Sequence, residues 1–305
     1  MKVLITGTSG FLGARILRRF QENHCCIAPS HRELDICDVA QCVQVIQAAQ
    51  PDWVIHVAAV SDVGECERNP ECSYQVNVLG TENLAKACAA AGSRMLFMSS
   101  DQVYGGNQTV LPNREEEVCP INVYGRQKLL AEQKMRAILP DSIALRLSWM
   151  YDLPDNKSEA EVDGPDRGMK DGAANLTGMQ ANVKSNFLTQ ILDAVYKEKE
   201  VAFSDKEYRG ITYAQEVAEQ METILTAPGG VYHFASPAAD TTYRLARQVF
   251  EVLGKGQQAE RLLRKREDAM PRSLAMTQER VREQGVYFSE TLDGICRCLR
   301  EHGFL

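Results

Sequence analysis

The chain has 305 residues, of which 44% are hydrophobic and 25% charged, and its formal net charge is −7. This composition is typical of a globular protein with a large core and excludes intrinsic disorder as its default state. The acidic charge also argues against a nucleic-acid partner, because such a partner requires a basic face.

The N-terminal apolar run is too short for a signal peptide, since Thr6 and Gly7 interrupt it. No later run approaches the roughly 20 apolar residues that cross a bilayer. We therefore expect a cytoplasmic protein that does not associate with membranes.

The ten cysteines are expected to be reduced thiols, because intracellular proteins rarely carry disulfides. Cys25 and Cys26 are adjacent, and Cys296 and Cys298 are separated by a single residue. Neither pair has the usual spacing of zinc ligands, so no metal site is predicted.

Strand-like and helix-like segments alternate through the first half of the chain. Short apolar runs predict strands at residues 3–5, 25–28, 53–57, 95–98 and 143–147. Helical apolar spacing predicts helices at residues 11–22, 39–49, 73–91 and 124–139. Such alternation is typical of an α/β fold with a doubly wound parallel sheet of the Rossmann type, covered by helices on both faces.

The second half begins with a change of composition. Residues 152–178 are rich in Asp, Glu, Gly, Asn and Lys, which predicts a long exposed loop near the substrate. Beyond it the pattern predicts a strand at 230–235 and helices at 186–197, 214–225, 243–253 and 289–302.

A glycine-rich turn lies between the first predicted strand and helix. Gly7, Gly10 and Gly13 have GxxGxxG spacing, which provides a tight turn, close approach of a pyrophosphate and close helix-to-strand packing. The following helix N-terminus attracts negative charge. This context predicts a dinucleotide site, with cofactor contacts from Gly7, Ser9, Gly10, Phe11, Leu12 and Gly13.

The residues after the second predicted strand bear on the choice of cofactor. NAD-selective sites carry an acidic residue there, whereas a basic side chain accommodates the 2′-phosphate of NADP. Ser30 and Arg32 slightly favour NADP over NAD, and the alternative is that Arg32 is a solvated loop residue. Asp35 and Ile36 follow closely and are expected to meet the adenine.

Tyr124 and Lys128 lie one turn apart on the same predicted helix. A ketone reductase needs such a pair, because a phenol with a pKa of about 10 is a poor acid-base group unless nearby positive charge favours its ionised form. Ser100 follows the end of a predicted strand, where open sheets bind ligands, and its hydroxyl can donate to a substrate carbonyl. The alternative is that Ser99 and Ser100 only cap the turn.

These three motifs in order resemble the extended short-chain dehydrogenases, and further segments resemble the dTDP-4-dehydrorhamnose reductase group. That group reduces the 4-keto function of a deoxy-sugar nucleotide with NAD(P)H. The resemblance implies a Rossmann domain at 1–150 with later returns near 183–203 and 211–235. It also implies a smaller C-terminal substrate-binding lobe built from 151–182 and 236–305. The segments that carry it are 51–59, 69–71, 76–81, 99–104 and 122–125.

Site roles follow from the resemblance position by position. Tyr124 is the expected proton donor, Lys128 its partner and Ser100 the carbonyl-binding hydroxyl. The resemblance also implies that Ala58 and Ala59 line the cofactor and that Asn77 supports the active-site helix.

Substrate-side residues are implied in the same way. Residues 146–149 are expected beneath the nicotinamide and sugar, with Trp149 either stacking on the sugar or packing in the core. Arg209 is expected to contact phosphate or sugar, or else to form a surface ion pair. Related dehydratases carry an Asp-Glu pair where this chain has Asp101 and Gln102, and since Gln cannot act as the base, dehydration is disfavoured.

The leading hypothesis is therefore an NAD(P)H-dependent nucleotide-sugar 4-ketoreductase. A nucleotide-sugar epimerase is one alternative, because a site that takes and returns hydride uses the same three residues. A non-catalytic regulatory subunit is another, because some relatives bind a nucleotide and a partner enzyme. Only the prevalence of twofold dimers bears on oligomeric state, and it favours a homodimer.

Overall fold

The computed structural model describes residues 1–154, 185–238 and 240–305. At its centre is a six-stranded parallel sheet with the order β10-β5-β4-β3-β1-β2. The order reverses between β1 and β3, and such a switch point is where open α/β sheets bind ligands. The predicted α/β fold is confirmed. The strands are β1 (Lys2–Thr6), β2 (Cys25–Ile27), β3 (Trp53–His56), β4 (Arg94–Ser100), β5 (Ile143–Leu147) and β10 (Gly230–His233).

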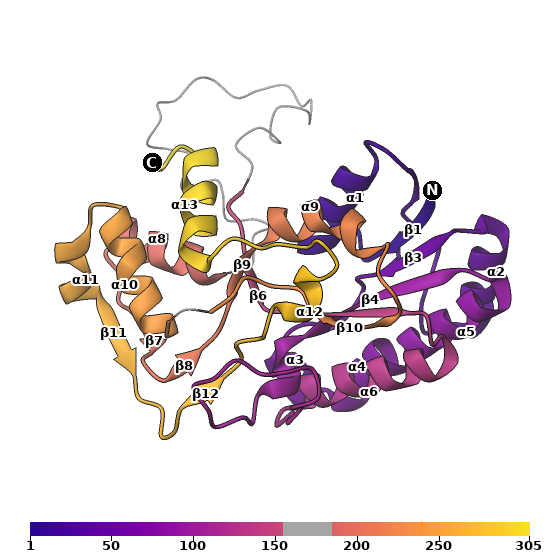
Figure 1. Ribbon diagram of the computed structural model, residues 1–305, viewed down its shortest axis with the longest axis horizontal. Helices are drawn as coiled ribbons and strands as arrows, with labels where there is room; N and C mark the ends of the chain where they lie inside the picture. Colours follow the sequence, from indigo (N-terminus) through magenta and orange to yellow (C-terminus); the bar gives the residue numbers. More distant parts are fainter. Residues whose placement is uncertain (155–184, 239) are drawn as a thin grey trace.

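Apolar residues on both faces of these strands explain why helices cover both sides of the sheet (Figure 1). In β1, Val3 and Ile5 face one core and Leu4 faces the other. This is the period of two expected of a strand buried on both faces. One face of the sheet is covered by α1 (Phe11–Phe20) and α9 (Ala214–Ile224), and the opposite face by α2 (Val39–Ala49), α5 (Thr81–Ala91) and α6 (Val123–Ile138).

The segment predicted as one helix at 73–91 is built differently. It begins with α4 (Pro70–Tyr74), continues as the π-helical η1 (Gln75–Gly80) and ends as α5. A π-helical turn is wider than an α-helical one and occurs often at functional sites. The short α3 (Val63–Arg68), just before it, was not predicted from the sequence.

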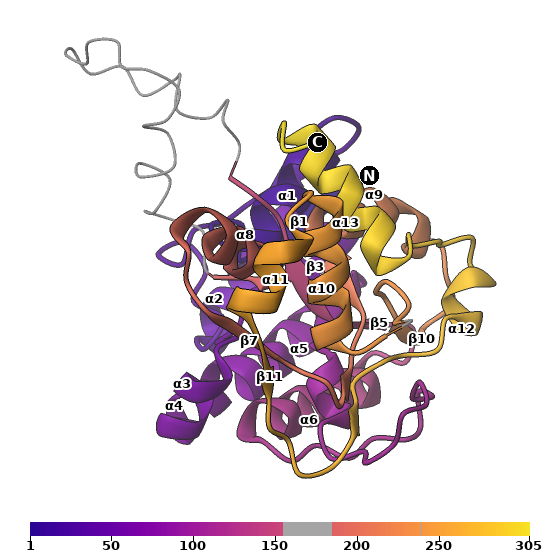
Figure 2. The same ribbon diagram turned by 90° about the vertical axis from the view of Figure 1, so that its left-hand side faces the viewer.

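A second core forms the smaller lobe, which faces the viewer in Figure 2. Its helices are α8 (Phe187–Lys197), α10 (Thr242–Val252), α11 (Gly256–Leu262) and α13 (Thr291–Glu301), and α12 (Glu279–Arg282) packs beside β10. Three short parallel pairs lie outside the six-stranded sheet: β6 (Trp149–Tyr151) with β9 (Ile211–Tyr213), β7 (Val201–Ser204) with β11 (Leu263–Arg266), and β8 (Glu207–Tyr208) with β12 (Arg272–Ser273).

The lobe differs from the expected division of the chain in one respect. A return to the sheet domain was expected near 183–203, but α8 and β7 pack in the second core, because Phe187, Ile191 and Phe203 are buried there. In the 211–235 segment, α9 covers the sheet and β10 extends it. Residues 155–178 of the predicted loop at 152–178 lie outside the described residues. The same is true of residues 155–182 in the lobe segment expected at 151–182.

Within the described ranges, no helix has both the length and the apolar character needed to cross a membrane.

Candidate active site

The turn after β1 can accept a pyrophosphate because its glycines leave no room for side chains. Gly7 has a φ of +72°, and a β-carbon there would lie 2.6 Å from the Ala58 backbone nitrogen. A β-carbon at Gly13 would lie 2.2 Å from the Gly7 carbonyl oxygen. Gly10 occupies the N-cap of α1, so the first amides of that helix receive no capping side chain and can bind an anion.

The other turn residues take distinct positions. Ser9 is exposed at the turn, and Phe11 is half-buried at the first helical position, where the Arg15 guanidinium lies 4.2 Å from its ring centroid. The Leu12 side chain is buried in the core between α1 and the sheet, where it supports the turn. The geometry of this turn therefore fits the predicted dinucleotide.

Two opposite charges follow β2. The expected Ser30 and Arg32 are both exposed there, but the Ser30 backbone nitrogen and hydroxyl each donate to Glu33 Oε2, at 2.8 Å. Sequence reasoning missed Glu33, although an acidic residue after this strand is the usual signal for ribose binding. Arg32 suits the 2′-phosphate of NADP and Glu33 suits the ribose hydroxyls of NAD.

Asp35 and Ile36, expected at the adenine, are largely engaged within the protein. Asp35 Oδ1 accepts from the Cys37 backbone nitrogen at 2.9 Å. Ile36 is buried against Gly80, where a β-carbon would lie 2.7 Å from its Cδ1. The Ile36 side chain therefore packs η1 onto this loop.

Asn77 connects the cofactor side of the site to the helix that carries Tyr124. Its side chain is buried in η1, where Oδ1 accepts from the Val60 nitrogen at 2.9 Å. Nδ2 donates to the Val60 carbonyl at 3.0 Å and to Gln127 Oε1 at 2.9 Å. Since Val60 follows the half-buried Ala58 and Ala59, Asn77 holds the segment after β3 against α6.

Ser100, Tyr124 and Lys128 meet at the carboxyl end of β4. Asn122 caps α6 by accepting from the Gly125 nitrogen at 2.7 Å, which places Tyr124 and Lys128 in the first two turns. Lys128 Nζ donates to the Met98 carbonyl at 2.8 Å and lies 5.7 Å from the Tyr124 ring centroid. The three predicted residues therefore share one end of the sheet.

Burial dominates the protonation of this group. It raises the pKa of Tyr124 above the ordinary value; the nearby Asp101 carboxylate raises it further, and a hydrogen bond with Ser100 opposes the shift. Burial also lowers the pKa of Lys128 to about 8. The sequence suggested that Lys128 would favour the ionised phenol, but burial has the larger effect here, so Tyr124 remains protonated at neutral pH.

The substrate-side residues converge on the same end of β4. Arg209, which follows β8, donates from Nε to Asp101 Oδ2 at 2.7 Å and from an Nη to Oδ1 at 3.0 Å. Its guanidinium lies 5.4 Å from the ring centroid of the half-buried Trp149. Gln102 Oε1 accepts from the Asn122 amide at 2.8 Å. Of the two predicted roles for Arg209, the structure shows an ion pair, but one inside the site.

Arg146, one of the residues expected beneath the nicotinamide and sugar, takes part in a buried network under α6. Its side chain is buried and binds Glu132 of α6, from Nε at 3.0 Å and from an Nη at 2.7 Å. The third nitrogen donates to the Tyr104 hydroxyl at 2.5 Å, and that hydroxyl lies 2.6 Å from His233 Nε2. Every nitrogen of the Arg146 guanidinium is therefore hydrogen-bonded within this network beneath α6.

Sequence reasoning missed Glu132 because a glutamate in a helix is usually solvated. The signal was its position one turn after Lys128, on the face of α6 that must pack against the sheet. Ser99 of β4 also donates to Glu132, so this carboxylate joins the two elements that carry Ser100 and Tyr124.

A glycine turn at the switch point, with a serine, a tyrosine and a lysine at the end of the next strands, defines a Rossmann-type fold of the extended short-chain dehydrogenases. The chain belongs to the RmlD substrate binding domain family, whose family model matches residues 1–160. The family predicted from the sequence is thereby confirmed.

Similar proteins include enzymes and a subunit of an enzyme. A dTDP-4-dehydrorhamnose reductase of Mycolicibacterium smegmatis is 35% identical over 153 residues, which cover 49% of this chain and 46% of that protein. The methionine adenosyltransferase 2 subunit beta of Xenopus laevis is 33% identical over 170 residues, which cover 53% of this chain and 50% of that protein.

Among solved structures, the dTDP-4-dehydrorhamnose reductase of Bacillus anthracis in complex with NADP has a TM-score of 0.78. The alignment covers 98% of both chains at 21% identity, and at that identity it establishes the fold.

Proposed function

We propose that this protein reduces the 4-keto group of a nucleotide-linked deoxy-sugar, with NAD(P)H as the reductant. The observation that carries the proposal is the meeting of Ser100, Tyr124 and Lys128 at the sheet end beside the glycine turn. The reductase relatives support the choice of substrate class.

Each of the three side chains has a defined task in the reaction. A bound NAD(P)H would supply hydride to the carbonyl carbon, and the carbonyl oxygen would then need a proton. Tyr124 donates that proton from its hydroxyl, which its raised pKa keeps protonated at neutral pH. The Ser100 hydroxyl donates a hydrogen bond to the same oxygen as negative charge develops there. Lys128, with a pKa of about 8, can return a proton to Tyr124 at neutral pH.

The substrate side fits a phosphorylated sugar. Arg209 keeps 15% of its side chain exposed while it binds Asp101, so it presents positive charge beside Trp149. An aromatic ring suits a sugar or base face, and a guanidinium suits a diphosphate. Gln102 remains unable to serve as a base, which opposes a dehydratase.

NADP is the slightly favoured cofactor because of Arg32 and because a similarly folded reductase binds NADP. Glu33 gives NAD a comparable site, so both are assigned as candidate cofactors. The cytoplasmic location and the homodimer stay predictions.

The test is NAD(P)H consumption, followed by absorbance, with a panel of nucleotide-linked 4-keto-sugars. Tyr124→Phe should lower turnover by about 100-fold or more, the usual contribution of a general acid, while cofactor affinity is retained. Tyr104→Phe is the matched control, because Tyr104 is a buried tyrosine of the same region that hydrogen-bonds only within the structural network described above. Undiminished turnover in Tyr124→Phe would exclude the mechanism.

The similarity to a methionine adenosyltransferase beta subunit favours one other function, that of a nucleotide-binding regulatory subunit. It predicts cofactor binding without consumption of NAD(P)H on any keto-sugar in the panel. An epimerase would instead interconvert sugar-nucleotide isomers without net NAD(P)H consumption.

A further inference from the structure

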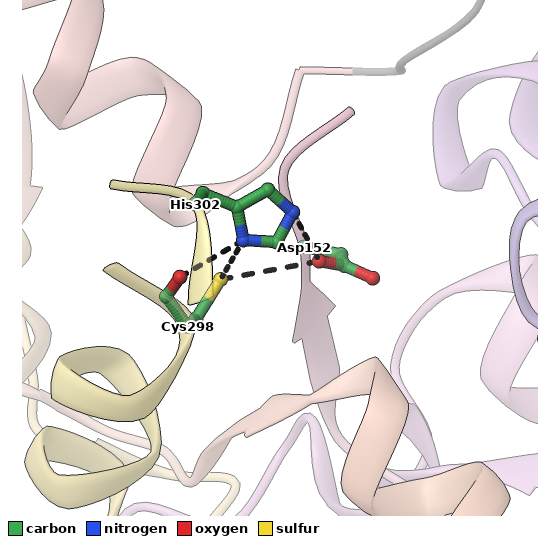
Figure 3. A group of neighbouring side chains, drawn as sticks. All are labelled: Asp152, Cys298 and His302. Carbon is green, nitrogen blue, oxygen red and sulfur yellow. Dashed lines mark hydrogen bonds and ion pairs between the residues drawn. The ribbon is translucent and has the colours of Figure 1, made fainter. Parts of the chain in front are cut away.

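Three side chains of kinds that bind metal ions converge at the end of α13 (Figure 3). Asp152 directly follows β6; Cys298 is on α13, and His302, four residues later, is the C-cap residue of that helix. One ligand atom from each lies within 4.8 Å of the other two. Two ligands at i and i+4 on a helix point to the same side, as in known helical zinc motifs.

The imidazole is oriented for coordination. His302 Nδ1 donates to the Cys298 carbonyl oxygen at 2.9 Å, which leaves the lone pair on Nε2. A backbone carbonyl in this role commonly fixes the tautomer of metal-binding histidines. His302 Nε2 then faces Asp152 Oδ1 at 3.9 Å, too far for a hydrogen bond.

The spacing of the ligand atoms matches a coordination sphere. Cys298 Sγ lies 3.9 Å from Asp152 Oδ1, the same distance as His302 Nε2 from that oxygen. Zinc bonds of about 2.0–2.3 Å in tetrahedral geometry place neighbouring ligand atoms roughly 3.3–3.8 Å apart. The Cys298 thiol also lies 3.8 Å from Nδ1 of His302. One ligand atom from each residue lies within 4.8 Å of the other two, so small side-chain shifts would bring the three to the required separation.

Burial and charge suit a divalent cation. The Asp152 and His302 side chains are 8% and 11% exposed, and Cys298 is fully buried. Burial raises the pKa values of both Asp152 and Cys298, and a cation would stabilise their ionised forms. Arg15 donates to Asp152 Oδ2 at 2.5 Å and balances part of the negative charge. Oδ1, which accepts from the Leu153 backbone nitrogen at 2.7 Å, is the oxygen nearer the thiol and imidazole.

We propose that Asp152, Cys298 and His302 bind a thiophilic divalent cation, of which Zn²⁺ is the expected one, and that the ion holds α13 against the end of β6. Three protein ligands leave a fourth tetrahedral position for water. The sequence prediction of no metal site considered pairs of cysteines, whereas this site combines three residue types from two distant segments.

The test uses the full-length, reduced and chelator-treated protein. Co²⁺ is the probe, because a thiolate bound to Co²⁺ gives a charge-transfer absorption band that Zn²⁺ should abolish on displacing it. The proposal predicts a band that saturates at one equivalent, and a rise in the unfolding temperature on addition of Zn²⁺.

Variants separate this site from adventitious binding. Cys298→Ala should abolish the band, and Cys296→Ser should keep it, because Cys296 is on the same helix but outside the cluster. His302→Gln is a second variant near the chain end, with an expected affinity loss of more than tenfold, because even loss of an outer-shell partner costs about 10- to 100-fold. Absence of a saturable band in the wild type, or an equal band in folded Cys298→Ala, would overturn the proposal.

Discussion

Two buried ion pairs lie near the active-site helix, and they differ in how completely they are enclosed. In Glu132–Arg146 both side chains are 3% exposed, and every guanidinium nitrogen has a protein acceptor. In Asp101–Arg209 the Asp101 side chain is fully buried, but the Arg209 side chain, whose guanidinium lies beside Trp149, is 15% exposed. Both are bidentate, so geometry alone does not distinguish them.

The difference lies in what else each charge can contact. Burial lowers the pKa of Arg146, but the hydrogen bonds and charge of Glu132 hold that pKa above its usual value. This is expected of an ion pair whose hydrogen bonds are all made. Burial raises the pKa of Asp101 in spite of Arg209, so this carboxylate is incompletely stabilised. The closed pair, Glu132–Arg146, therefore has a structural role. The open pair, Asp101–Arg209, lies at a sheet end, where Arg209 can exchange its partner for a ligand.

The largest expected effect is on the closed pair. Glu132→Ala leaves the Arg146 charge buried and unpaired, so the free energy of unfolding should fall by about 3–5 kcal/mol in denaturant titrations. The double variant Glu132→Met, Arg146→Met removes both charges and should lose less than the single variant. A larger loss of unfolding free energy in the double variant than in Glu132→Ala would contradict the interpretation that the two charges stabilise each other as a pair.

Lys128 tests the same principle with a buried cation that donates to a carbonyl, that of Met98. Its pKa falls from 10.5 in the unfolded chain to about 8 in the folded protein. Between those values the unfolded chain binds more protons, so stability of the wild type rises with pH there. Lys128→Met should therefore raise the unfolding free energy at pH 7 but abolish turnover.

The stability gain of Lys128→Met should disappear as the pH approaches 10.5, where the lysine is neutral in both states. Unfolding titrations at a series of pH values measure this. Lys134→Met is a control, because Lys134 lies on the same helix but pairs with Glu82 near the surface. A gain that does not change with pH would contradict the assigned cause.

The open pair, Asp101–Arg209, should affect substrate binding. Arg209→Met should raise KM for the nucleotide-sugar by about 10- to 100-fold, since hydrogen bonds to charged groups contribute about 1.5–3 kcal/mol. Steady-state kinetics measure this, with the exposed Arg244→Met as a control. An unchanged KM would assign Arg209 to structure alone.

The smallest expected effect is a shift in pH dependence. The Asp101 charge raises the pKa of Tyr124, so Asp101→Asn should lower that pKa. Because a proton donor must be protonated, the rate falls as pH rises through its pKa. The alkaline limb of kcat/KM should therefore move to lower pH in Asp101→Asn, and movement to higher pH would contradict the electrostatic assignment.

Much of the sheet domain and part of the site were predictable from the sequence. The strands around Val3 and Ile55, the glycine turn, and the set of Ser100, Tyr124 and Lys128 all follow from short-range patterns. A strand buried on both faces, a turn without room for a β-carbon and a helical i, i+4 pair each constrain residues that are close in sequence.

Only the tertiary structure decided which distant side chains meet. Asp101 pairs with Arg209, which is 108 residues away in the sequence, and Asp152 contacts Cys298, which is 146 residues away. The same holds for the packing of α8 in the second core. The sequence by itself determined the local geometry, because backbone sterics and apolar periodicity act between neighbours. The pairing of buried charges depends on how the lobe packs onto the sheet, and no local pattern encodes that.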